Sequence, residues 1–360
     1  MKKALFYKKL KNHQIQCQAC NHYCLILSAK KGICGVRENI KGELYALTYG
    51  LACAENIDPI EKKPLFHFLP GSYSLSIATV GCNFRCSYCQ NWDISQGPKI
   101  NPALFFDCIS CEKIKPIRKK CGVNQKIDGF ELSPGKIIQD ALDSGCQSIS
   151  YTYTEPTVFV EYAIETMKLA QERGIKNVWV SNGYMSKKVL EEISPYLDAI
   201  NIDLKSFKEK FYQEICGARL KPVLENLKII KNLDIWLEIT TLVIPGFNDS
   251  PKKFEQIAYF IKNELGDETP WHLSKFSPEI SWQMQNLPPT PDKTIQKARE
   301  IGLEGGLKYV YTGNIRENSG ENTYCPKCKT LNIKRIGFSI ERLDKNGKCW
   351  KCGNHLNLIV

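Results

Sequence analysis

The sequence predicts an α/β fold: a partial (β/α)6 TIM-like barrel with an N-terminal cysteine-rich module and a C-terminal zinc ribbon. Three observations lead to this prediction. Short β-branched or aromatic runs alternate with amphipathic segments, polar residues follow the ends of these runs, and most of the 17 cysteines fall into groups. Alternating strands and helices favour parallel strands with right-handed crossovers. In such barrels the active site gathers at the carboxyl ends of the strands.

Seven runs have the composition of β-strands, because they are rich in β-branched and aromatic residues. They are Leu75–Val80, Ser148–Thr154, Asn177–Ser181, Ala199–Leu204, Ile235–Val243, Trp271–Phe276 and Tyr309–Thr312. Apolar residues at helical spacing predict helices between them, most clearly over Thr157–Arg173, where Gly174 follows as a C-cap glycine. Further helices are expected near Lys187–Ile193, Pro222–Lys231, Pro251–Leu265 and Pro291–Ile301.

The composition is that of an ordinary globular protein, with 43% hydrophobic and 24% charged residues. We divide the chain into three segments: an N-terminal cysteine-rich module with its lead-in (1–73), a barrel core (74–316) and a zinc-ribbon-like module (317–360). The core contains a basic, cysteine-containing insert at 97–131. Six polar groups follow successive predicted strands of the core, which indicates a site at the carboxyl edge of the sheet.

The net charge of +11 is partly due to lysines near the N-terminus, and such a tail is usually solvated. We therefore do not expect a nucleic-acid partner. No apolar stretch approaches the roughly 18 residues that span a bilayer, and the N-terminus lacks the apolar region of a signal peptide. We expect a cytoplasmic protein without a membrane partner. Because the cytosol keeps thiols reduced, its cysteines are expected to bind metals rather than to form disulfides.

The segment GCNFRCSYCQNW at 81–92 contains three cysteines, Cys82, Cys86 and Cys89, directly after the first predicted strand. A [4Fe–4S] cluster has four irons and binds cysteine thiolates, so three thiolates leave one iron open. An open position on a metal is where chemistry takes place. Tyr88 is placed to shield one face of a ligand bound there. A zinc knuckle, or a ferredoxin-like site with a distant fourth cysteine, is the alternative.

Two further groups contain four cysteines each. The C-terminal group has the paired spacing of a zinc ribbon, which closes a tetrahedral site of four thiolates, Cys325, Cys328, Cys349 and Cys352. The N-terminal group fits either zinc or a second iron–sulfur cluster, because spacing alone does not decide between them. Its members are Cys17, Cys20, Cys24 and Cys34.

The remaining cysteines are less informative. Two interpretations remain for the cysteines of the insert, Cys108, Cys111 and Cys121. They bind a structural metal with an unidentified fourth ligand, or they are unbound thiols in a loop. Isolated cysteines are usually small buried hydrophobes, which is what we expect of Cys53, Cys146 and Cys216. We also expect His67, in the lead-in to the core, to be structural.

The C-x3-C-x2-C loop resembles that of the radical S-adenosylmethionine (SAM) superfamily. The wider chain, over roughly 17–330, is similar to the pyruvate formate-lyase activating enzyme-like branch, and most similar to the AmmeMemoRadiSam system radical SAM enzymes. The stretches that carry the resemblance are DPIEKKPLFHFLPGS, GCNFRCSYCQNWDISQ, YTYTEPT, SNGYM, NIDLKSF and ENTYCPKC. The resemblance implies that the barrel is a radical SAM core, and that the amine and carboxylate of SAM complete the coordination of the fourth iron.

The resemblance also implies roles for individual residues. Glu155 and Pro156 match the segment that meets the SAM amine, and the Ser181–Asn182–Gly183 turn matches the one near the methionyl end. Asp203 and Lys205 match a motif in which the lysine pairs with the SAM carboxylate. Ile244–Gly246 match the adenine-side loop, and His272 matches a histidine near the ribose and carboxylate. Where glycyl-radical activases often have an acidic residue, this sequence has Val180.

The function implied by this resemblance is reductive cleavage of SAM to a 5′-deoxyadenosyl radical, which abstracts a hydrogen atom from an unknown substrate. The cofactor carries the difficult chemistry while the protein binds and orients it. The implied partners are an electron donor such as ferredoxin or flavodoxin and a small-molecule or protein substrate, in an organism living with little oxygen. Two alternatives remain: an activase of glycyl-radical enzymes, and a metal-dependent RNA- or protein-binding scaffold.

Overall fold

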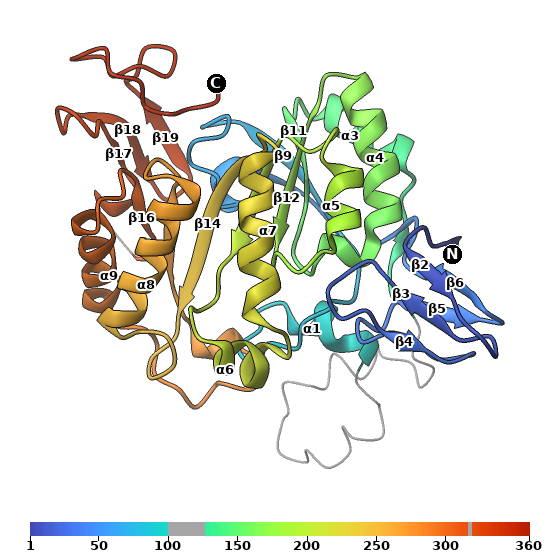
Figure 1. Ribbon diagram of the computed structural model, residues 1–360. Helices are drawn as coiled ribbons and strands as arrows, with labels where there is room; N and C mark the ends of the chain where they lie inside the picture. Colours follow the sequence, from blue (N-terminus) through green and yellow to red (C-terminus); the bar gives the residue numbers. More distant parts are fainter. Residues whose placement is uncertain (100–126, 316–318) are drawn as a thin grey trace.

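The computed structural model describes residues 1–99, 127–315 and 319–360. Figure 1 shows a central sheet with helices around it, small N-terminal strands on one side and a C-terminal strand group on the other. Cys108, Cys111 and Cys121, which the sequence leaves open between a metal site and unbound thiols, lie outside the described residues.

The central sheet has eight strands in the order β16-β15-β14-β13-β12-β11-β9-β8. All neighbours from β9 to β16 are parallel, whereas β8 joins the edge antiparallel to β9. The strands are β8 (Ala54–Pro59), β9 (Tyr73–Ala78), β11 (Ser148–Tyr151), β12 (Lys176–Ser181), β13 (Ala199–Asp203), β14 (Trp236–Val243), β15 (Trp271–Lys275) and β16 (Val310–Gly313). The α/β class with a parallel sheet is therefore confirmed, and β8 is a strand that the sequence pattern did not reveal.

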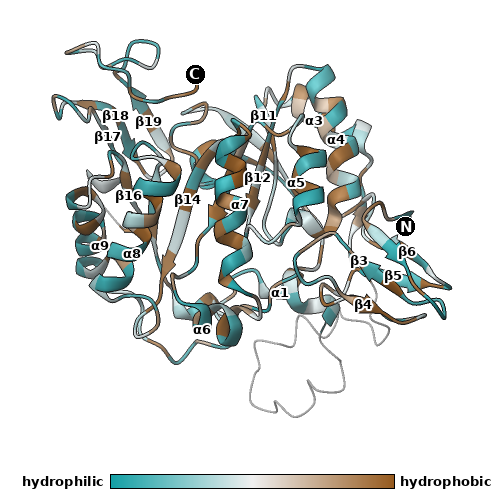
Figure 2. Ribbon diagram, viewed as in Figure 1, coloured by the Kyte–Doolittle hydropathy of each residue, from teal (hydrophilic) through white to brown (hydrophobic). Residues whose placement is uncertain are grey.

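Helices connect the parallel strands and pack on the sheet. They are α3 (Pro134–Asp143), α4 (Val160–Glu172), α5 (Lys187–Ile193), α7 (Leu220–Asn232), α8 (Pro251–Phe260) and α9 (Asp292–Glu304). Both hydrophobic and hydrophilic residues occur along them in Figure 2, as expected of helices buried on one side. The apolar residues that predicted α4 are all buried, and Gly174 has a φ of +71° after its end. Among the described residues, no helix is both long and apolar enough to cross a membrane.

Two predicted helices differ from the observed ones at their ends. The first begins with a 3-10 turn, Pro156–Phe159, before α4, because Glu155 caps that turn by accepting a hydrogen bond from the Thr157 backbone. The other continues beyond α8 as a π-helical turn, Ile261–Leu265. Helix α3 was not predicted, although Ser133 caps it and Pro134 occupies its first position.

Residues 60–72, here called the plug segment, connect β8 to β9 and pack against the inner face of the sheet. Leu65 and Phe68 of this segment contact Val178, Ala199 and Trp236, which lie near the amino ends of β12, β13 and β14. The backbone N–H groups of Phe66 and His67 donate to the buried Glu238 carboxylate at 3.0 and 2.8 Å. The plug segment therefore fills the amino end of the sheet and leaves the carboxyl end for a site.

The N-terminal module consists of two small antiparallel sheets. Their orders are β1-β6-β5 and β2-β3-β4. The strands are β1 (Lys2–Lys3), β2 (Tyr7–Lys9), β3 (Ile15–Cys17), β4 (Leu25–Ile26), β5 (Arg37–Ile40) and β6 (Glu43–Ala46). Arg37 of β5 forms a buried, two-point ion pair with Glu161 of α4, at 2.6 and 2.8 Å. Because both side chains are buried, this pair anchors the module on the core.

The C-terminal residues form a three-stranded antiparallel sheet, β17-β18-β19. The strands are β17 (Thr323–Tyr324), β18 (Leu331–Ile336) and β19 (Ser339–Arg342). Arg335 of β18 reaches the plug segment, where it donates to the Phe66 carbonyl oxygen at 2.7 Å. The remaining short elements are β7 (Leu51–Ala52) paired with β10 (Phe130–Glu131), and the helices α1 (Trp92–Gln96) and α6 (Glu209–Phe211).

Candidate functional site

The segment from Cys82 to Cys89, here called the cluster loop, leaves the carboxyl end of β9 and folds under the N-terminal module. Gly81 starts it with a φ of +97°, and a Cβ there would lie 2.6 Å from Cγ1 of Val36. Only glycine fits this position, since both the backbone conformation and the close approach exclude a side chain. The Gly81 N–H donates to the Ile94 carbonyl at 2.8 Å, so the loop closes onto helix α1.

The three thiols of the cluster loop lie in a largely buried place. Cys82 and Cys86 are buried, and Cys89 is partly buried. Burial raises the pKa of the Cys82 thiol to about 12 and also raises the pKa of Cys89. The Ser95 hydroxyl lies 3.2 Å from the Cys89 sulfur. Thiols that resist ionisation in this way become thiolates when a cationic metal group binds them, so the donor set fits an iron–sulfur cluster.

Cys216 lies beside the cluster loop, whereas the sequence analysis predicted only that it is buried. It ends a π-helical turn, Tyr212–Cys216, and its carbonyl accepts a hydrogen bond from Arg85 N at 2.9 Å. Its sulfur is 3.7 Å from the Tyr88 hydroxyl, and a hydrogen bond from Cys86 to Cys216 raises the pKa of Cys86. No spacing rule could reveal this contact, because Cys216 lies 128 residues after Tyr88.

Glu155 is fully buried and holds the turn at Ser181–Gly183. Its carboxylate accepts hydrogen bonds from the Ser181 hydroxyl at 2.9 Å, the Asn182 backbone at 2.9 Å and the Thr157 backbone at 3.1 Å. Burial raises its pKa, although these donors oppose the shift. The structure thus places Glu155 behind the turn, where donors of the chain itself occupy both of its oxygens.

The turn that Glu155 holds points toward the cluster loop. The Asn182 amide donates to the Asn83 side-chain oxygen at 2.7 Å, and its nitrogen is 3.9 Å from the Cys82 sulfur. Gly183 has a φ of +73°. The structure therefore brings the predicted Ser181–Asn182–Gly183 turn into contact with the first cysteine of the loop.

Lys205 is a largely buried cation two residues after the end of β13, with a side chain that is 12% exposed. Its ammonium lies 2.9 Å from an Asp203 carboxylate oxygen and 5.7 Å from the centre of the Tyr88 ring. Burial opposes the charge, but the Asp203 carboxylate outweighs it and raises the pKa of Lys205 well above its ordinary value. The lysine is therefore protonated beside the cluster loop, where an anionic ligand would meet it.

The loop after β14 is hydrogen-bonded to the backbone of Lys205. Asn248 donates to the carbonyl oxygens of Lys205 and Leu242, both at 2.8 Å, and accepts from the Ile244 backbone at 2.6 Å. Gly246 has a φ of +79° with open space on its side-chain side. The predicted adenine-side loop therefore lies beside the end of β13.

His272 faces a different set of groups. Its Nε2 is 2.6 Å from Glu238, and its ring packs against those of Phe66 and Tyr311 at centroid distances of 4.7 and 5.2 Å. These contacts hold the imidazole against the plug segment. The structure thus gathers Asn182, Asp203 and Lys205 around the cluster loop, which includes Tyr88, and places His272 against the plug segment. Its predicted contact with SAM stays a prediction.

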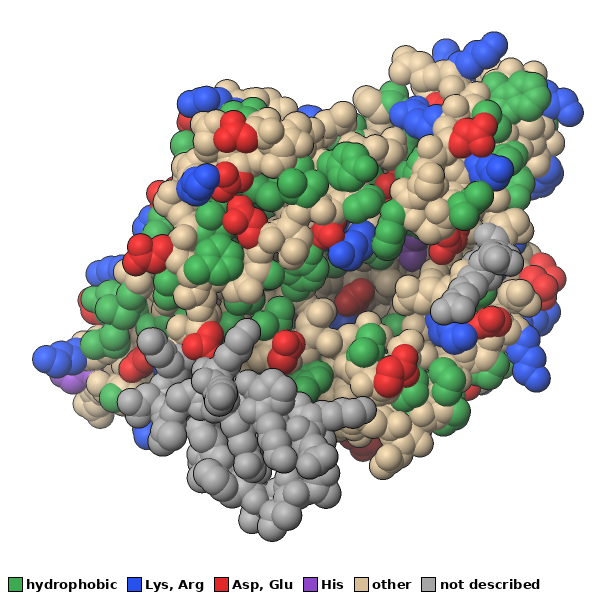
Figure 3. Space-filling model, turned by 180° about the vertical axis from the view of Figure 1, so that it is seen from behind, with side chains coloured by type: hydrophobic (Ala, Val, Ile, Leu, Met, Phe, Trp, Pro, Cys, Tyr) green, Lys and Arg blue, Asp and Glu red, His purple; other side chains and the backbone are tan. Residues whose placement is uncertain are grey.

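The face opposite to the view of Figure 1 is hollowed near its middle. Acidic, basic and histidine side chains border this hollow in Figure 3. Polar residues also occupy the inner face of the sheet, as shown by the hydrogen bond of 2.6 Å between Ser74 and Ser150. Charged groups at the border of the hollow are suited to a charged cofactor or substrate.

The C-terminal cysteines converge on one point. The four sulfurs all lie within 4.8 Å of one another, and the pairs Cys325–Cys352 and Cys328–Cys349 are each 3.6 Å apart. A tetrahedral zinc with bonds of about 2.3 Å to sulfur places its ligands about 3.8 Å apart. The set therefore fits a single metal ion. Zinc as its identity remains a prediction.

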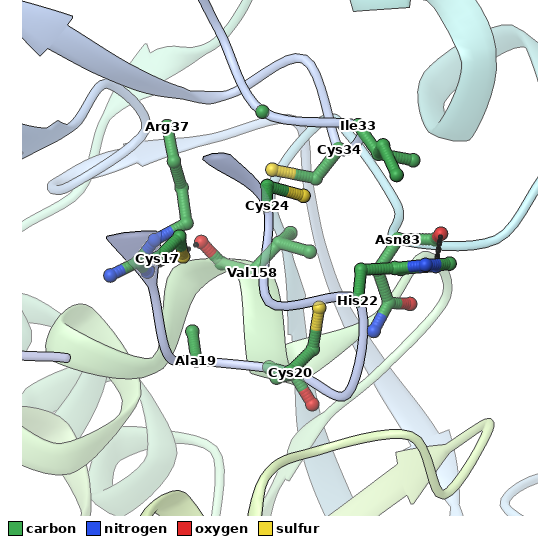
Figure 4. A pocket seen from close by; sticks show the side chains of 12 residues that line it. Cys17, Ala19, Cys20, His22, Cys24, Ile33, Cys34, Arg37, Asn83 and Val158 are labelled. Atoms are coloured by element: carbon green, nitrogen blue, oxygen red, sulfur yellow. Dashed lines mark hydrogen bonds between the residues drawn. The ribbon is translucent and has the colours of Figure 1, made fainter. Parts of the chain in front are cut away.

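The N-terminal cysteines line one cavity of about 20 Å³, together with His22 and Arg37. Figure 4 shows Cys24 and Cys34 above the cavity, with Cys17 and Cys20 to its left and below. Asn83 of the cluster loop also lines it. The structure thus brings this group together and places it next to the cluster loop.

The chain matches the radical SAM superfamily over residues 76–258. An uncharacterised protein of Methanocaldococcus jannaschii is 42% identical over 363 residues, covering 100% of both chains. A putative glycyl-radical enzyme activating enzyme of the same organism is 27% identical, covering 65% of this chain and 78% of the relative. The pyruvate formate-lyase-activating enzyme of Clostridium pasteurianum is 25% identical, covering 63% of this chain and 87% of the relative. The predicted resemblance is confirmed: the chain belongs to the radical SAM superfamily and is an enzyme similar to the activating enzymes.

Proposed function

We propose that the cluster loop binds a [4Fe–4S] cluster at the carboxyl edge of a partial (β/α)6 barrel, and that SAM binds beside it. The bound cluster and SAM supply a 5′-deoxyadenosyl radical by one-electron cleavage of a carbon–sulfur bond, and this radical abstracts a hydrogen atom. The observation that carries the proposal is the ammonium of Lys205, whose side chain is 12% exposed and which lies between Asp203 and the Tyr88 ring beside the cluster loop. A buried cation of this kind matches the carboxylate of an amino-acid ligand.

Each residue of the site has a task in this proposal. Cys82, Cys86 and Cys89 bind three irons and leave the fourth open. Lys205 pairs with the SAM carboxylate, and Asp203 orients the lysine through their hydrogen bond of 2.9 Å. Tyr88, which is buried, covers one side of the ligand and excludes water.

Glu155 acts as a positioning residue. Since its oxygens accept from Thr157, Ser181 and Asn182, it fixes the turn that presents Asn182 to the cluster loop. We propose that the turn, rather than the Glu155 carboxylate itself, meets the methionyl end of SAM. Gly246, on the loop tied to the carbonyl of Lys205, leaves room for the adenine side.

The remaining parts of the proposal concern partners and modules. A low-potential protein such as ferredoxin or flavodoxin supplies the electron, and the substrate is a small molecule or a protein that enters the hollow of Figure 3. The C-terminal module is a structural zinc ribbon, because its four thiolates leave no open coordination position. The three-segment division at residues 73 and 316 and the cytoplasmic location remain part of this proposal.

An activase of glycyl-radical enzymes is the second candidate function. The names of two relatives favour it, since both are called activating enzymes. Their similarity covers 65% and 63% of this chain, and Val180 stands where such activases often have an acidic residue. Incubation with deuterated candidate substrates separates the two functions. An activase removes deuterium from a glycine of a partner protein, whereas an enzyme that acts on a small molecule does not.

The test of the proposed function is electron paramagnetic resonance of the anaerobically reconstituted protein. The reduced protein should show a cluster signal that changes when SAM is added, and Cys86→Ala should abolish this change. Cys146→Ala is the matched control and should leave the signal intact, because Cys146 is a buried cysteine in the turn between α3 and β11. A wild-type signal that ignores SAM counts decisively against the site.

A further inference from the structure

One cavity is lined by four cysteines that we call the N-terminal cysteine set: Cys17, Cys20, Cys24 and Cys34. The loop that carries them is held by backbone hydrogen bonds. Cys17 N donates to the Cys24 carbonyl at 2.9 Å, and Gly32 N donates to the Arg37 carbonyl at 2.9 Å. Cys20 pairs with Met185 in an isolated bridge next to the Ser181–Gly183 turn. Residues of the N-terminal module thus line most of the cavity, and Asn83, Thr157 and Val158 of the core complete the lining.

The spread of these sulfurs separates a cluster from a single ion. Within the ranges 1–99, 127–315 and 319–360, only the C-terminal cysteines bring three or more metal-binding atoms within 4.8 Å of one another. One tetrahedral zinc requires that closeness, with sulfurs about 3.8 Å apart. The thiolates of a cubane each bind a different iron and therefore stand farther apart. In this respect the N-terminal cysteine set is arranged like the cluster loop.

Two buried donors border the cavity. Arg37 Nε and Asn83 Nδ2 are buried N–H groups without a hydrogen-bond partner, and both residues line the cavity. The other nitrogens of Arg37 bind Glu161, so Nε is the donor left over. A buried donor calls for an acceptor, and the sulfurs of an anionic iron–sulfur cluster accept such N–H bonds.

The cavity is joined to the cluster loop by a hydrogen bond. His22 Nε2 is 2.9 Å from the Asn83 carbonyl oxygen. Because a carbonyl only accepts, the His22 Nε2 carries the hydrogen of this bond. His22 follows Cys20 by two residues and Asn83 follows Cys82 directly. The route between the two sets of cysteines is therefore short: a few covalent bonds and one hydrogen bond.

We propose that the N-terminal cysteine set holds a second iron–sulfur cluster, which passes single electrons through His22 and Asn83 to the cluster loop. A reduced flavin or iron–sulfur protein gives one electron to the second cluster. That cluster is oxidised again when it passes the electron on, and the cluster of the loop is reduced by one electron. No bond forms or breaks in this transfer. The electron-relay role rests on the proposed function, whereas occupation of the cavity does not.

Occupation is tested in full-length protein with Cys82→Ala, Cys86→Ala and Cys89→Ala combined. This variant leaves the N-terminal cysteine set untouched. After anaerobic reconstitution it should retain about four irons per chain, and on reduction show a cluster signal that does not respond to SAM. Zinc in place of iron at these cysteines, or no metal there, would overturn the proposal. The converse variant, Cys24→Ala with Cys34→Ala, should lose those irons and keep the SAM-sensitive signal.

The relay is tested with His22→Leu, which removes the hydrogen bond to Asn83 and leaves all cysteines in place. Rapid-freeze resonance should show that reduction of the SAM-sensitive cluster by flavodoxin slows at least about tenfold, a change in barrier of about 1.4 kcal/mol. Reduction by dithionite, a small reductant with direct access, should be unchanged. His13→Leu is the matched control, because His13 is an exposed histidine of the same module. Equal rates in both variants refute the relay.

The two levels of failure are distinguishable. A wild-type protein whose signal ignores SAM refutes the proposed function, whatever iron the cavity holds. A triple-alanine variant without iron refutes the second cluster, even if the wild-type protein cleaves SAM.

Discussion

The two ends of the chain each contain four cysteines, but the structure treats them differently. The C-terminal sulfurs converge within 4.8 Å on a small sheet, and Cys352 is exposed. The N-terminal sulfurs surround a cavity against the cluster loop, with Cys17 and Cys34 buried. Four thiolates can therefore serve different purposes. Two cysteines of each set are buried, so the sets differ mainly in how closely their sulfurs approach one another. Sulfurs that converge on one point are suited to a single structural ion, and sulfurs spread around a cavity beside the cluster loop are suited to a larger metal group.

The attachments of the two ends also differ. Arg37 binds the N-terminal module to the core through one buried ion pair with Glu161. The C-terminal module is held by a series of hydrogen bonds instead. Arg335 donates to the Thr323 hydroxyl, and this hydroxyl is 2.9 Å from the Tyr311 hydroxyl. The Tyr311 hydroxyl in turn is 2.5 Å from His67 Nε2. His67 Nδ1 donates in turn to the Asn357 carbonyl at 2.8 Å.

The largest expected effect is loss of the C-terminal metal. Cys325→Ala with Cys349→Ala should remove about one zinc per chain and unfold the module, because zinc binding to such sites supplies about 10–16 kcal/mol of apparent free energy. Hydrogen exchange of residues 319–360 measures the unfolding. The N-terminal irons should be unaffected. The matched control is Cys53→Ala with Cys146→Ala, and a folded, metal-free module in the test variant contradicts the comparison.

The next effect concerns the buried arginines. Arg37→Met leaves Glu161 as an unpaired buried charge and should lower the free energy of unfolding by about 3–5 kcal/mol. Arg335→Met removes hydrogen bonds and a longer contact of 3.9 Å with Glu61. Because burial raises the pKa of Glu61 to about 7, this carboxyl can become neutral by taking up a proton, and a smaller loss of about 1–3 kcal/mol is expected. Denaturant unfolding of the two variants measures both values. Arg37→Met combined with Glu161→Leu should recover most of the first loss. If it does not, the ion pair is not the anchor.

Acid should loosen the C-terminal attachment through His67. Burial lowers the pKa of His67 from 6.5 to about 4, so between these values the unfolded chain binds the proton and the folded chain does not. Stability therefore falls as the pH drops from about 6.5 to 4, by up to about 3 kcal/mol. Protonation also takes away the acceptor that Tyr311 uses.

Other groups titrate in the same range with opposite sign. Burial raises the pKa of Glu61 to about 7, which stabilises the folded protein as the pH falls through that value. The measurement is therefore the difference in unfolding free energy between wild type and His67→Gln, determined by urea unfolding at several pH values. The difference in unfolding free energy should shrink as the pH falls. A difference that does not vary with pH shows that His67 is not the titrating group.

The smallest expected effect lies between the two ends, at Lys205. A charge-assisted hydrogen bond to the SAM carboxylate is worth about 1.5–3 kcal/mol, so Lys205→Met should weaken SAM binding by about 10- to 150-fold. Iron content should remain that of the wild type. Asp203→Asn should do less, because Asp203 orients the lysine. Isothermal titration under anaerobic conditions decides: an unchanged dissociation constant with intact clusters removes Lys205 from the site.

Much of the fold follows from local patterns. The seven predicted strands all appear in the parallel sheet, because β-branched runs between helices are buried on both faces. The apolar stripe of α4 was readable for the same reason, since burial imposes the period of the helix. Strand β8 escaped prediction because its residues, AENIDP, are mixed in character and its partner β9 supplies the pairing.

Within the candidate site, spacing along the chain predicted Cys82, Cys86 and Cys89 because consecutive ligands of a cluster leave a local signature. Contacts between distant segments leave none. Cys216, the bond from His22 to Asn83 and the pair His272–Glu238 join residues far apart in sequence, and only packing reveals them.

Residue type and short-range spacing were enough to predict the family, the three-cysteine loop and the groups of four cysteines near both ends of the chain. The tertiary structure decided what each group surrounds. It drew the C-terminal sulfurs together in a small sheet and spread the N-terminal sulfurs around a cavity that Asn83 helps to close. The physical reason is that the distance between ligand atoms, and the donors left unpaired around them, depend on how separate segments pack. Spacing along the chain does not record that packing.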